Sequence, residues 1–369
     1  MASGKVLIVR AAGPAAFGLT PRERLERLSA RQGLELTEDP AQAGLIVRGD
    51  QVYGAAVFNA LAASAPGTVL VDGHGRALAA RVDGPSRDWA RALLDTATPG
   101  AGVPEEAAIV DAATLAGRHN LQLSKRLAPL LMPATDRGAM EKALFRESYK
   151  GVTDLVTKHV WPPLAFAATR WCARRGLTPN QVTLVSAALV ALAFWLFWEG
   201  QFALGLIAAW TMTLLDTVDG KLARVTLRSS PFGDIFDHGI DLIHPPFWYW
   251  AWIMGLAAQG MALGDGGLIL ALIVGGYVLQ RLEEGLFIHL FGMQIHVWQR
   301  FDSLFRQITA RRNPNLLILT VATILGAPDQ GIVVVAGWTV FCLLVHLARI
   351  VQALAARRAG PLVSWLAQG

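Results

Sequence analysis

The chain has 369 residues, of which 53% are hydrophobic and only 17% charged, a composition too apolar for an average soluble protein. Its formal net charge is +5, but the basic residues stand beside apolar stretches, which favours a membrane surface over nucleic acid as the partner. Cys172 and Cys342 are the only cysteines, so the sequence has neither a disulfide framework nor the spacing of a cysteine zinc site.

The first 140 residues carry ordinary numbers of charged residues and predict a small α/β domain. Strands are expected at residues 5–10, 44–48 and 68–72, and helices at 21–32, 52–63 and 86–96. This alternation is typical of an α/β sandwich with a partly parallel sheet. We assign residues 1–100 to this domain, which we expect to stay in the cytoplasm because the chain begins without the apolar segment of a signal peptide.

The next part of the chain connects this domain to the membrane. Residues 98–104 are rich in Pro and Gly and predict a linker, and residues 101–150 are expected to be linker and helices. Residues 152–172 mix apolar side chains with Lys158, His159 and Arg170, which predicts a helix lying along the membrane interface.

Residues 151–360 predict an α-helical membrane domain with six transmembrane helices. The Thr178-Pro179-Asn180 stretch has the break and start signals of a helix. Apolar segments long enough or nearly long enough to span follow at 181–198, 201–219, 236–258, 266–290, 314–327 and 330–353. The fifth is short, and the third begins with acidic residues that indicate a hydrated cavity.

Charges in the connections between these segments indicate their orientation. Lys and Arg precede the first segment, lie between the second and third and between the fourth and fifth, and follow the sixth. The alternate connections hold Glu199, Asp265 and Asp329 without Lys or Arg. Since Lys and Arg stay on the cytoplasmic side, the pattern predicts a multi-pass protein of the inner membrane with both termini in the cytoplasm.

Four aspartates form the most informative pattern. Asp216 and Asp219 are three residues apart, and Asp237 and Asp241 are four apart, so each pair shares one face of a helix. Four carboxylates at a membrane edge repel one another and are costly to desolvate, so a cation is expected to hold them ionised. Oxygen ligands without cysteine favour Mg²⁺ or Mn²⁺, and two ions could share the cluster. With Arg224 nearby, such a site suits a pyrophosphate.

The full pattern over residues 216–241 reads D-x2-D-G-x2-A-R-x8-G-x3-D-x3-D, and it resembles the signature of the CDP-alcohol phosphotransferases at every fixed position. The resemblance covers about residues 148–355. It implies that Asp216, Asp219, Asp237 and Asp241 bind the metal ions, and that Asp216, Gly220, Ala223 and Arg224 contact the CDP-alcohol donor. It further implies that an acceptor hydroxyl attacks the β-phosphorus, that CMP leaves, and that the enzyme is a homodimer.

Two residues compete for the role of catalytic base. Asp241 is one candidate. His238 is the other, because Phe236-Asp237-His238-Gly239 resembles the choline and ethanolamine phosphotransferases, in which the matching histidine is proposed to deprotonate the lipid hydroxyl. The alternative for His238 is a hydrogen bond at a helix end.

The N-terminal domain resembles a second family. A strand followed by Ala11-Ala12-Gly13, and later Gly49-Asp50-Gln51-Val52, resembles a sugar-phosphate nucleotidyltransferase, a domain that is fused to inositol-type members of the membrane family. The phosphate-binding loop of that family should follow Gly13, but this chain has Pro14 to Pro21 there, and the domain is about half the expected length. We therefore expect a remnant without nucleotidyl transfer, which packs on the membrane domain or helps it dimerise, and whose removal leaves transfer intact.

Several functions compete on these patterns. A phosphotransferase that moves a phosphoalcohol from a CDP-alcohol to a lipid or polyol hydroxyl is favoured by Asp237-His238-Gly239, whereas the N-terminal remnant favours transfer from CDP-inositol or CDP-diacylglycerol. An ion transporter would also place acids in membrane spans, but these acids lie near one surface. A non-enzymatic scaffold would need no intact signature. The basic stretch Arg306–Asn315 either binds a phosphate or is an ordinary cytoplasmic loop.

Overall fold

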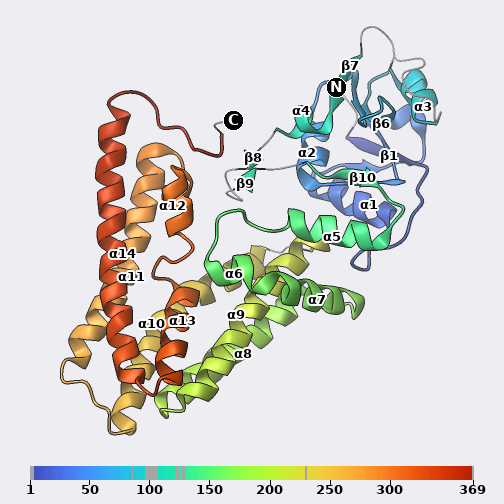
Figure 1. Ribbon diagram of the computed structural model, residues 1–369. Helices are drawn as coiled ribbons and strands as arrows, with labels where there is room; N and C mark the ends of the chain where they lie inside the picture. Colours follow the sequence, from blue (N-terminus) through green and yellow to red (C-terminus); the bar gives the residue numbers. More distant parts are fainter. Residues whose placement is uncertain are drawn as a thin grey trace.

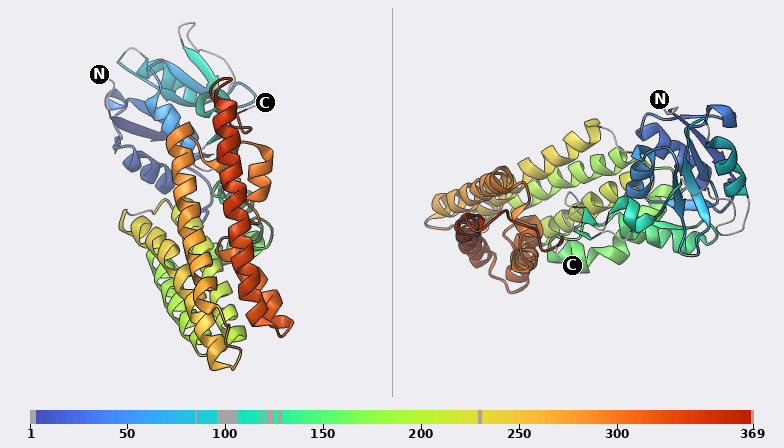
Figure 2. Two further views of the ribbon diagram at one scale, coloured as in Figure 1. Left: turned by 90° about the vertical axis from the view of Figure 1, so that its left-hand side faces the viewer. Right: turned by 90° about the horizontal axis from the view of Figure 1, so that it is seen from above.

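The protein has an α/β domain at one end of a bundle of long helices (Figure 1). The computed structural model describes residues 4–84, 86–95, 107–117, 119–120, 125–126, 129–228 and 231–367, and no side chain is described at 119–120, 125–126, 231–232 and 234–238. Both ends of the chain lie at the same end of the bundle as the α/β domain (Figure 2). This placement agrees with an even number of passes through the bundle.

The α/β domain is built on a mixed sheet with the strand order β2-β1-β3-β6-β5-β7. Strand β1 is parallel to β2 and β3, whereas β6 is antiparallel to both of its neighbours. The strands of this sheet are β1 (Lys5–Val9), β2 (Glu35–Leu36), β3 (Leu45–Arg48), β5 (Thr68–Val71), β6 (Ala77–Arg81) and β7 (Ala108–Asp111). The predicted α/β sandwich with a partly parallel sheet is therefore confirmed.

Helices cover this sheet where the sequence predicts them. Helix α1 begins after Thr20, whose side chain and that of Glu23 form a reciprocal capping box. The helices of this domain are α1 (Pro21–Arg31), η1 (Pro40–Gln42), α2 (Ala55–Ala63), α3 (Arg87–Asp95) and α4 (Ala112–Ala116). Strand β6 is an addition to the prediction, because its sequence Ala-Leu-Ala-Ala-Arg lacks the β-branched residues typical of strands.

The α/β fold continues past residue 100, into the segment that we expected to be linker and helices. Strand β7 pairs with β5, and β10 (Leu131–Pro133) pairs with β4 (Gln51–Tyr53). The short β8 (His119–Asn120) and β9 (Lys125–Arg126) pair with each other, and α5 (Arg137–Glu147) then leads to the bundle.

In the described part of the chain, three short helices and seven longer ones make up the bundle end of the protein. Thr178 caps α8 and shares a capping box with Gln181, as the start signal in the sequence predicts. The helices are α6 (Leu155–His159), α7 (Trp161–Arg174), α8 (Pro179–Trp198), α9 (Phe202–Val225), α10 (Pro231–Ala258), α11 (Gly266–Phe291), η2 (Ile295–Val297), α12 (Arg300–Phe305), α13 (Arg312–Ile324) and α14 (Pro328–Arg357).

The predicted count of six transmembrane helices is not confirmed, although the helical bundle itself is. Among the described residues, four helices are long and apolar enough to cross a membrane, namely α8, α9, α11 and α14. Helix α13 has 13 residues and reaches only roughly 20 Å at 1.5 Å per residue, against a hydrocarbon core of about 30 Å. Helix α10 has 28 residues, but some of its side chains lie outside the described part.

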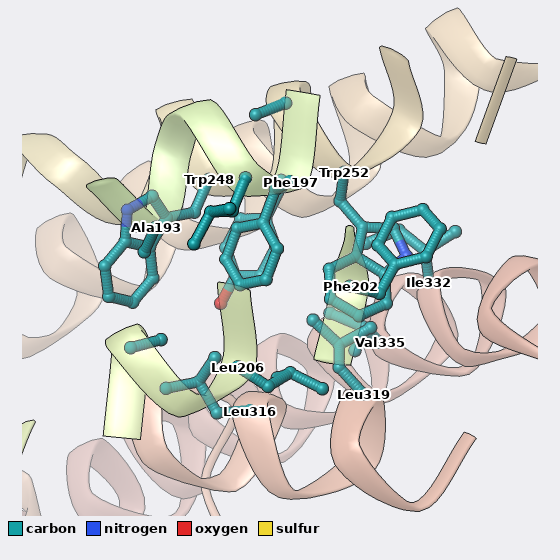
Figure 3. Close-up of a cluster of buried hydrophobic side chains, with 14 of the residues drawn as sticks. Ala193, Phe197, Phe202, Leu206, Trp248, Trp252, Leu316, Leu319, Ile332 and Val335 are labelled. Atoms are coloured by element: carbon teal, nitrogen blue, oxygen red, sulfur yellow. The ribbon is translucent and has the colours of Figure 1, made fainter. Parts of the chain in front are cut away.

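Large apolar side chains point outward from these helices, as expected of an integral membrane protein. Leu184, Val334 and Val351 are each more than half exposed. Inside the bundle, aromatic residues pack between helices, and the ring centroids of Phe202 and Trp252 are 4.4 Å apart (Figure 3). The interior is thus filled by side chains of the bundle itself, and the exposed apolar side chains on the outside can contact lipid.

Candidate functional site

The acidic residues of the signature come from two helices that follow each other in the chain. Asp216 and Asp219 lie on α9, one turn apart, and Asp241 lies on α10. Asp216 and Asp241 are brought together in space, although 25 positions separate them. Two of the four predicted acids, Asp216 and Asp241, thus lie close together, and the site of four aspartates stays a prediction.

Arg312 joins the two carboxylates. Its Nη2 donates to Oδ2 of Asp216 and its Nη1 donates to Oδ1 of Asp241, each over 2.5 Å. The side chains of Arg312 and Asp216 are 16% exposed, and that of Asp241 is 40% exposed. The guanidinium therefore offsets the repulsion between two carboxylates that are partly removed from water.

The residues after Arg312 fix the start of α13. Asn313 Nδ2 donates to Oδ1 of Asp154 over 3.0 Å, and Asn315 Nδ2 donates to the hydroxyl of Tyr249 over 2.8 Å. Burial alone would raise the pKa of Asp154, but hydrogen bonds from the Thr157 backbone N–H and from Asn313 lower it below its usual value. Asp154 is therefore a carboxylate, and it holds Arg312 in place through α13.

Asp219 is more deeply buried than Asp216 and Asp241. The residue is 3% exposed, and its Oδ2 accepts a hydrogen bond of 2.7 Å from the hydroxyl of Thr183 on α8. Thr183 also donates to the carbonyl of Pro179 at the start of that helix. The first turn of α8 therefore orients the carboxylate of Asp219.

The last two turns of α9 are tied to the end of α5. Lys221 Nζ and Arg224 Nη1 both donate to the main-chain carbonyl of Ser148, over 3.0 and 2.5 Å. Lys221 Nζ also lies 3.3 Å from the ring centroid of Tyr149, a cation–π contact. Gly220 lies on the same face, and a Cβ added there would stand 3.1 Å from Nη2 of Arg224. A larger residue would therefore crowd Arg224.

A cavity of about 440 Å³ lies beside these residues, and it is large enough for a small ligand. Its lining includes Asp216, Asp241, Gly220 and Arg224 of the signature. Among the residues that the structure describes, seven cationic side chains and three carboxylates line it. They are Lys150, Lys221, Arg224, Arg281, Arg306, Arg311 and Arg312, with Asp154, Asp216 and Asp241. The excess of positive charge suits an anionic ligand.

A second group of charged side chains at the cavity is centred on Glu284 and is ordered by ion pairs and a hydrogen bond. Glu284 on α11 pairs with Arg311, with Arg281 over 3.2 Å and with His296 over 3.2 Å. Burial lowers the pKa of Arg306 to about 9, and the neighbouring charge of Arg311 acts in the same direction, so the guanidinium stays charged at neutral pH. Burial likewise lowers the pKa of His296 to about 3, which leaves its imidazole neutral. A second cavity of about 250 Å³ adjoins this group and is lined by Lys150, Glu284, His296, Arg306 and Arg311 among others.

The predicted site residues have different outcomes. The structure brings Asp216, Asp241, Gly220 and Arg224 to the cavity. Asp219 lies behind them against α8, and Ala223 is on the same helix without lining the cavity. The side chains of Asp237 and His238 lie outside the described part of the chain, so their predicted roles stay predictions.

The donor atoms fit a hard divalent cation. Among the described residues, no three His, Cys, Asp or Glu side chains are close enough to hold a metal ion together. The fourth expected ligand, Asp237, is outside that set. Asp216 and Asp241 nevertheless approach closely enough to share one guanidinium, and all their donor atoms are carboxylate oxygens. Oxygen ligands of this kind are those that Mg²⁺ and Mn²⁺ prefer.

Sequence reasoning missed several residues that the fold brings to the cavity. Arg281 stands in an apolar segment beside two glutamates, and charged residues in such a segment signal a function. Arg312 lies in the basic stretch that the sequence assigns either to a phosphate site or to a plain loop, and the structure adds that its guanidinium pairs with Asp216 and Asp241. Thr183 gave no signal, because a threonine in the first turn of a helix is common.

Comparison with known proteins identifies the class. Residues 176–297 match the family model for CDP-alcohol phosphatidyltransferase. A bifunctional IPC transferase and DIPP synthase of Rubrobacter xylanophilus is 32% identical over 166 residues, which is 42% of this chain and 33% of the relative. An archaetidylinositol phosphate synthase of Pyrococcus horikoshii is 26% identical over 183 residues, 47% of this chain and 85% of the relative. Cholinephosphotransferase 1 of Gallus gallus is 31% identical over 132 residues, 32% of this chain and 39% of the relative.

Residues 176–297, which lie in the bundle, are thus similar to the CDP-alcohol phosphatidyltransferase family, and the long apolar helices indicate an integral membrane protein. The family model and two of these relatives are named for phosphatidyl or phosphoalcohol transfer. The matches span about a third of the first relative and two fifths of the third. The names differ in the alcohol and the product, so the particular reaction is inferred from the site.

Proposed function

We propose that this protein is a divalent-cation-dependent phosphotransferase that moves the phosphate-bearing half of a CDP-alcohol to a hydroxyl of a second substrate and releases CMP. One observation carries this proposal. Asp216 and Asp241 come from two helices and share Arg312, at a cavity whose lining is largely cationic. Such a cavity suits a diphosphate held between metal ions and guanidinium groups. The distribution of Lys and Arg between the spans supports a cytoplasmic position for it.

The donor is assigned to the α9 side of the cavity. Gly220 exposes backbone there without a side chain, and Arg224 offers the planar donor groups that bind phosphate oxygens in pairs. We assign Ala223 to the donor side as well, although it lies on α9 behind the residues that line the cavity. We assign the metal ions, Mg²⁺ or Mn²⁺, to the four carboxylates Asp216, Asp219, Asp237 and Asp241. When bound, such ions offset the negative charge of the diphosphate.

In the proposed reaction, the acceptor hydroxyl attacks the β-phosphorus of the CDP-alcohol. The bond between that phosphorus and the oxygen bridging to the α-phosphate breaks, and CMP leaves with the electron pair. The proton of the hydroxyl passes to a base of the chain. Asp241 suits this role because it lines the cavity and is 40% exposed, and His238 is the rival base.

The cationic lining supports an acceptor that carries a phosphate of its own. Four cationic side chains line the cavity in addition to those of the signature helix and Arg312, and Arg306 among them stays charged at neutral pH; they are Lys150, Arg281, Arg306 and Arg311. Guanidinium groups bind phosphate in bidentate geometry. We therefore favour a phosphorylated polyol over a neutral acceptor, in line with the inositol phosphate named for the Pyrococcus horikoshii relative.

A second candidate is transfer of a CDP-linked head group to a neutral lipid hydroxyl. The Phe236–Gly239 sequence and the similarity to Cholinephosphotransferase 1 favour it. For either reaction we expect a homodimer in the membrane.

Release of CMP tests the proposal. Purified protein with Mg²⁺ should form CMP from at least one member of a panel of CDP-alcohols when phosphorylated polyols and lipid acceptors are supplied. Asp216→Asn should lower the rate at least about a hundredfold, since the metal site loses a charged ligand. The matched control Asp265→Asn, at an exposed position before α11, should keep the wild-type rate. Equal rates in wild type and Asp216→Asn would refute the site.

A further inference from the structure

Two arginines of the α/β domain reach the C-terminal end of α9, the helix that carries the signature. Arg24 Nη1 donates to the carbonyl of Val225 over 2.8 Å, and Arg27 Nη1 donates to the carbonyl of Thr226 over 2.6 Å. The last carbonyls of a helix lack partners within the helix and carry a partial negative charge. These two guanidinium groups therefore complete the C-terminal end of α9 from a distant part of the sequence.

Arg24 is buried at this contact. Its residue surface is 6% exposed, and burial lowers the pKa of its guanidinium to about 10, so it stays charged at neutral pH. A buried charge is costly unless it has a partner, and the end of α9 supplies one. The contact between Arg24 and the end of α9 is therefore part of the buried interior, unlike the contacts of an exposed surface arginine.

The residue that follows this helix end is inserted into the α/β domain. Leu227 has a positive φ of 54°, a conformation that is sterically unfavourable for leucine. Its side chain is 8% exposed and belongs to the same apolar cluster as Leu25 and Leu28 of α1. Packing in this cluster holds the backbone of Leu227 in that conformation.

The domain is docked at a second place as well. The backbone N–H of Phe17 donates to Oε1 of Glu141 on α5 over 3.4 Å, and Oε2 of this fully buried glutamate pairs with Arg170 on α7 over 2.7 Å. Gly18 has a φ of 75°, and a Cβ added there would stand 3.2 Å from the carbonyl oxygen of Ala173. The loop that follows Gly13 therefore packs on α7, between the domain and the bundle (Figure 1).

These contacts bear directly on the signature. Val225 follows Arg224, and Asp216 lies nine residues earlier on the same continuous helix. Helix α10, which carries Asp241, begins at Pro231, four positions after Leu227. A helix of this kind moves as a rigid rod over two to three turns, so a shift of its end displaces the groups that line the cavity.

We propose that the α/β domain acts as a clamp on the end of α9, and that Arg24 and Arg27 are positioning residues for the signature carboxylates. Only the expected effect of the clamp on transfer rests on the proposed function. The expected immobilisation of residues 219–228 does not depend on that function. It also replaces the expectation that removal of residues 1–100 leaves transfer intact.

Hydrogen–deuterium exchange and Mn²⁺ binding of the full-length protein test the clamp. Arg24→Met and Arg27→Met keep the alkyl part of the side chain and remove the donor groups. In each, amide exchange in peptides covering residues 219–228 should rise roughly tenfold, as expected for loss of a charge-assisted hydrogen bond. Mn²⁺ affinity, followed by electron paramagnetic resonance, should weaken several-fold, and Arg24→Lys should restore part of both.

The matched control is Arg22→Met. Arg22 lies on the same helix, but it is exposed and pairs only with Glu26 and Glu38 of its own domain among the described contacts. This variant should keep wild-type exchange and Mn²⁺ binding. If Arg24→Met does not yield folded protein, Arg27→Met at the less buried position carries the test.

Three outcomes separate the clamp from the proposed function. Unchanged exchange in folded Arg24→Met and Arg27→Met protein overturns the clamp, even if transfer falls. Raised exchange with unchanged Mn²⁺ affinity overturns the positioning role. A wild-type protein that forms no CMP contradicts the proposed function, whereas the exchange experiment still decides whether the domain holds α9.

Discussion

Replacing Arg312 by methionine should destabilise the protein more strongly without a divalent cation than with one. Arg312 donates to Asp216 and to Asp241 over 2.5 Å each, and its removal leaves two carboxylates facing each other. Breaking a buried ion pair by removing one partner costs about 3–5 kcal/mol. Because Asp241 is 40% exposed, water screens part of this effect, and we expect a loss of about 2–3 kcal/mol.

The loss corresponds to a fall in the melting temperature of about 4–12 °C for a domain of this size, at 2–4 °C per kcal/mol. Mg²⁺ or Mn²⁺ should recover most of it, since a bound cation offsets the same carboxylates and stabilises the state that binds it. The measurement is thermal unfolding of detergent-solubilised protein, followed by intrinsic tryptophan fluorescence, in a chelator and in a series of Mg²⁺ concentrations.

Arg349→Met is the matched control. Arg349 on α14 pairs with the buried Asp302 over 2.6 Å, at a place away from the cavity. Its loss should lower the melting temperature equally with and without Mg²⁺. The reasoning is refuted if Arg312→Met behaves like this control, because the two signature carboxylates would then not share a cation site.

Two further predictions concern neighbouring groups. Thr183→Val removes the hydroxyl that donates to Asp219 and should weaken Mn²⁺ binding by about tenfold. Thr183→Ser keeps a hydroxyl and should bind Mn²⁺ as the wild type does. Equal Mn²⁺ affinity in all three proteins would contradict the orienting role of Thr183. His296 has its pKa lowered to about 3 by burial, so the unfolded chain binds the extra proton and stability falls as the pH drops from about 6.5 towards 3. At pH 5 the free energy of unfolding should be about 2 kcal/mol lower, at 1.36 kcal/mol per pH unit. Denaturant unfolding should show this pH dependence in the wild type but not in His296→Gln. Parallel pH curves for the two proteins would show that another group titrates.

The sequence predicts those parts of the fold that depend on local pattern. The first strand, the helices at 21–31 and 55–63, and the capped start of α8 follow from periodicity and capping residues. The convergence of Asp216 with Asp241 also follows, because each acid lies on a helix face fixed by its spacing and the helices are neighbours in the chain.

What could not be predicted depends on contacts between distant segments. Arg312 meets Asp216 across 96 positions, and Arg24 meets Val225 across 201. Neither pairing leaves a local trace, since an arginine at a helix end or on an amphipathic helix is ordinary.

Phosphorus hyperfine coupling to bound Mn²⁺ tests the central claim most directly. The account predicts that wild-type protein loaded with Mn²⁺ and a CDP-alcohol shows ³¹P coupling by electron–nuclear double resonance, and that Asp216→Asn shows none at the same concentrations. A ³¹P coupling that is equally strong in Asp216→Asn, or saturable Mn²⁺ binding without any ³¹P coupling in wild type, would place the diphosphate away from these carboxylates and contradict the account.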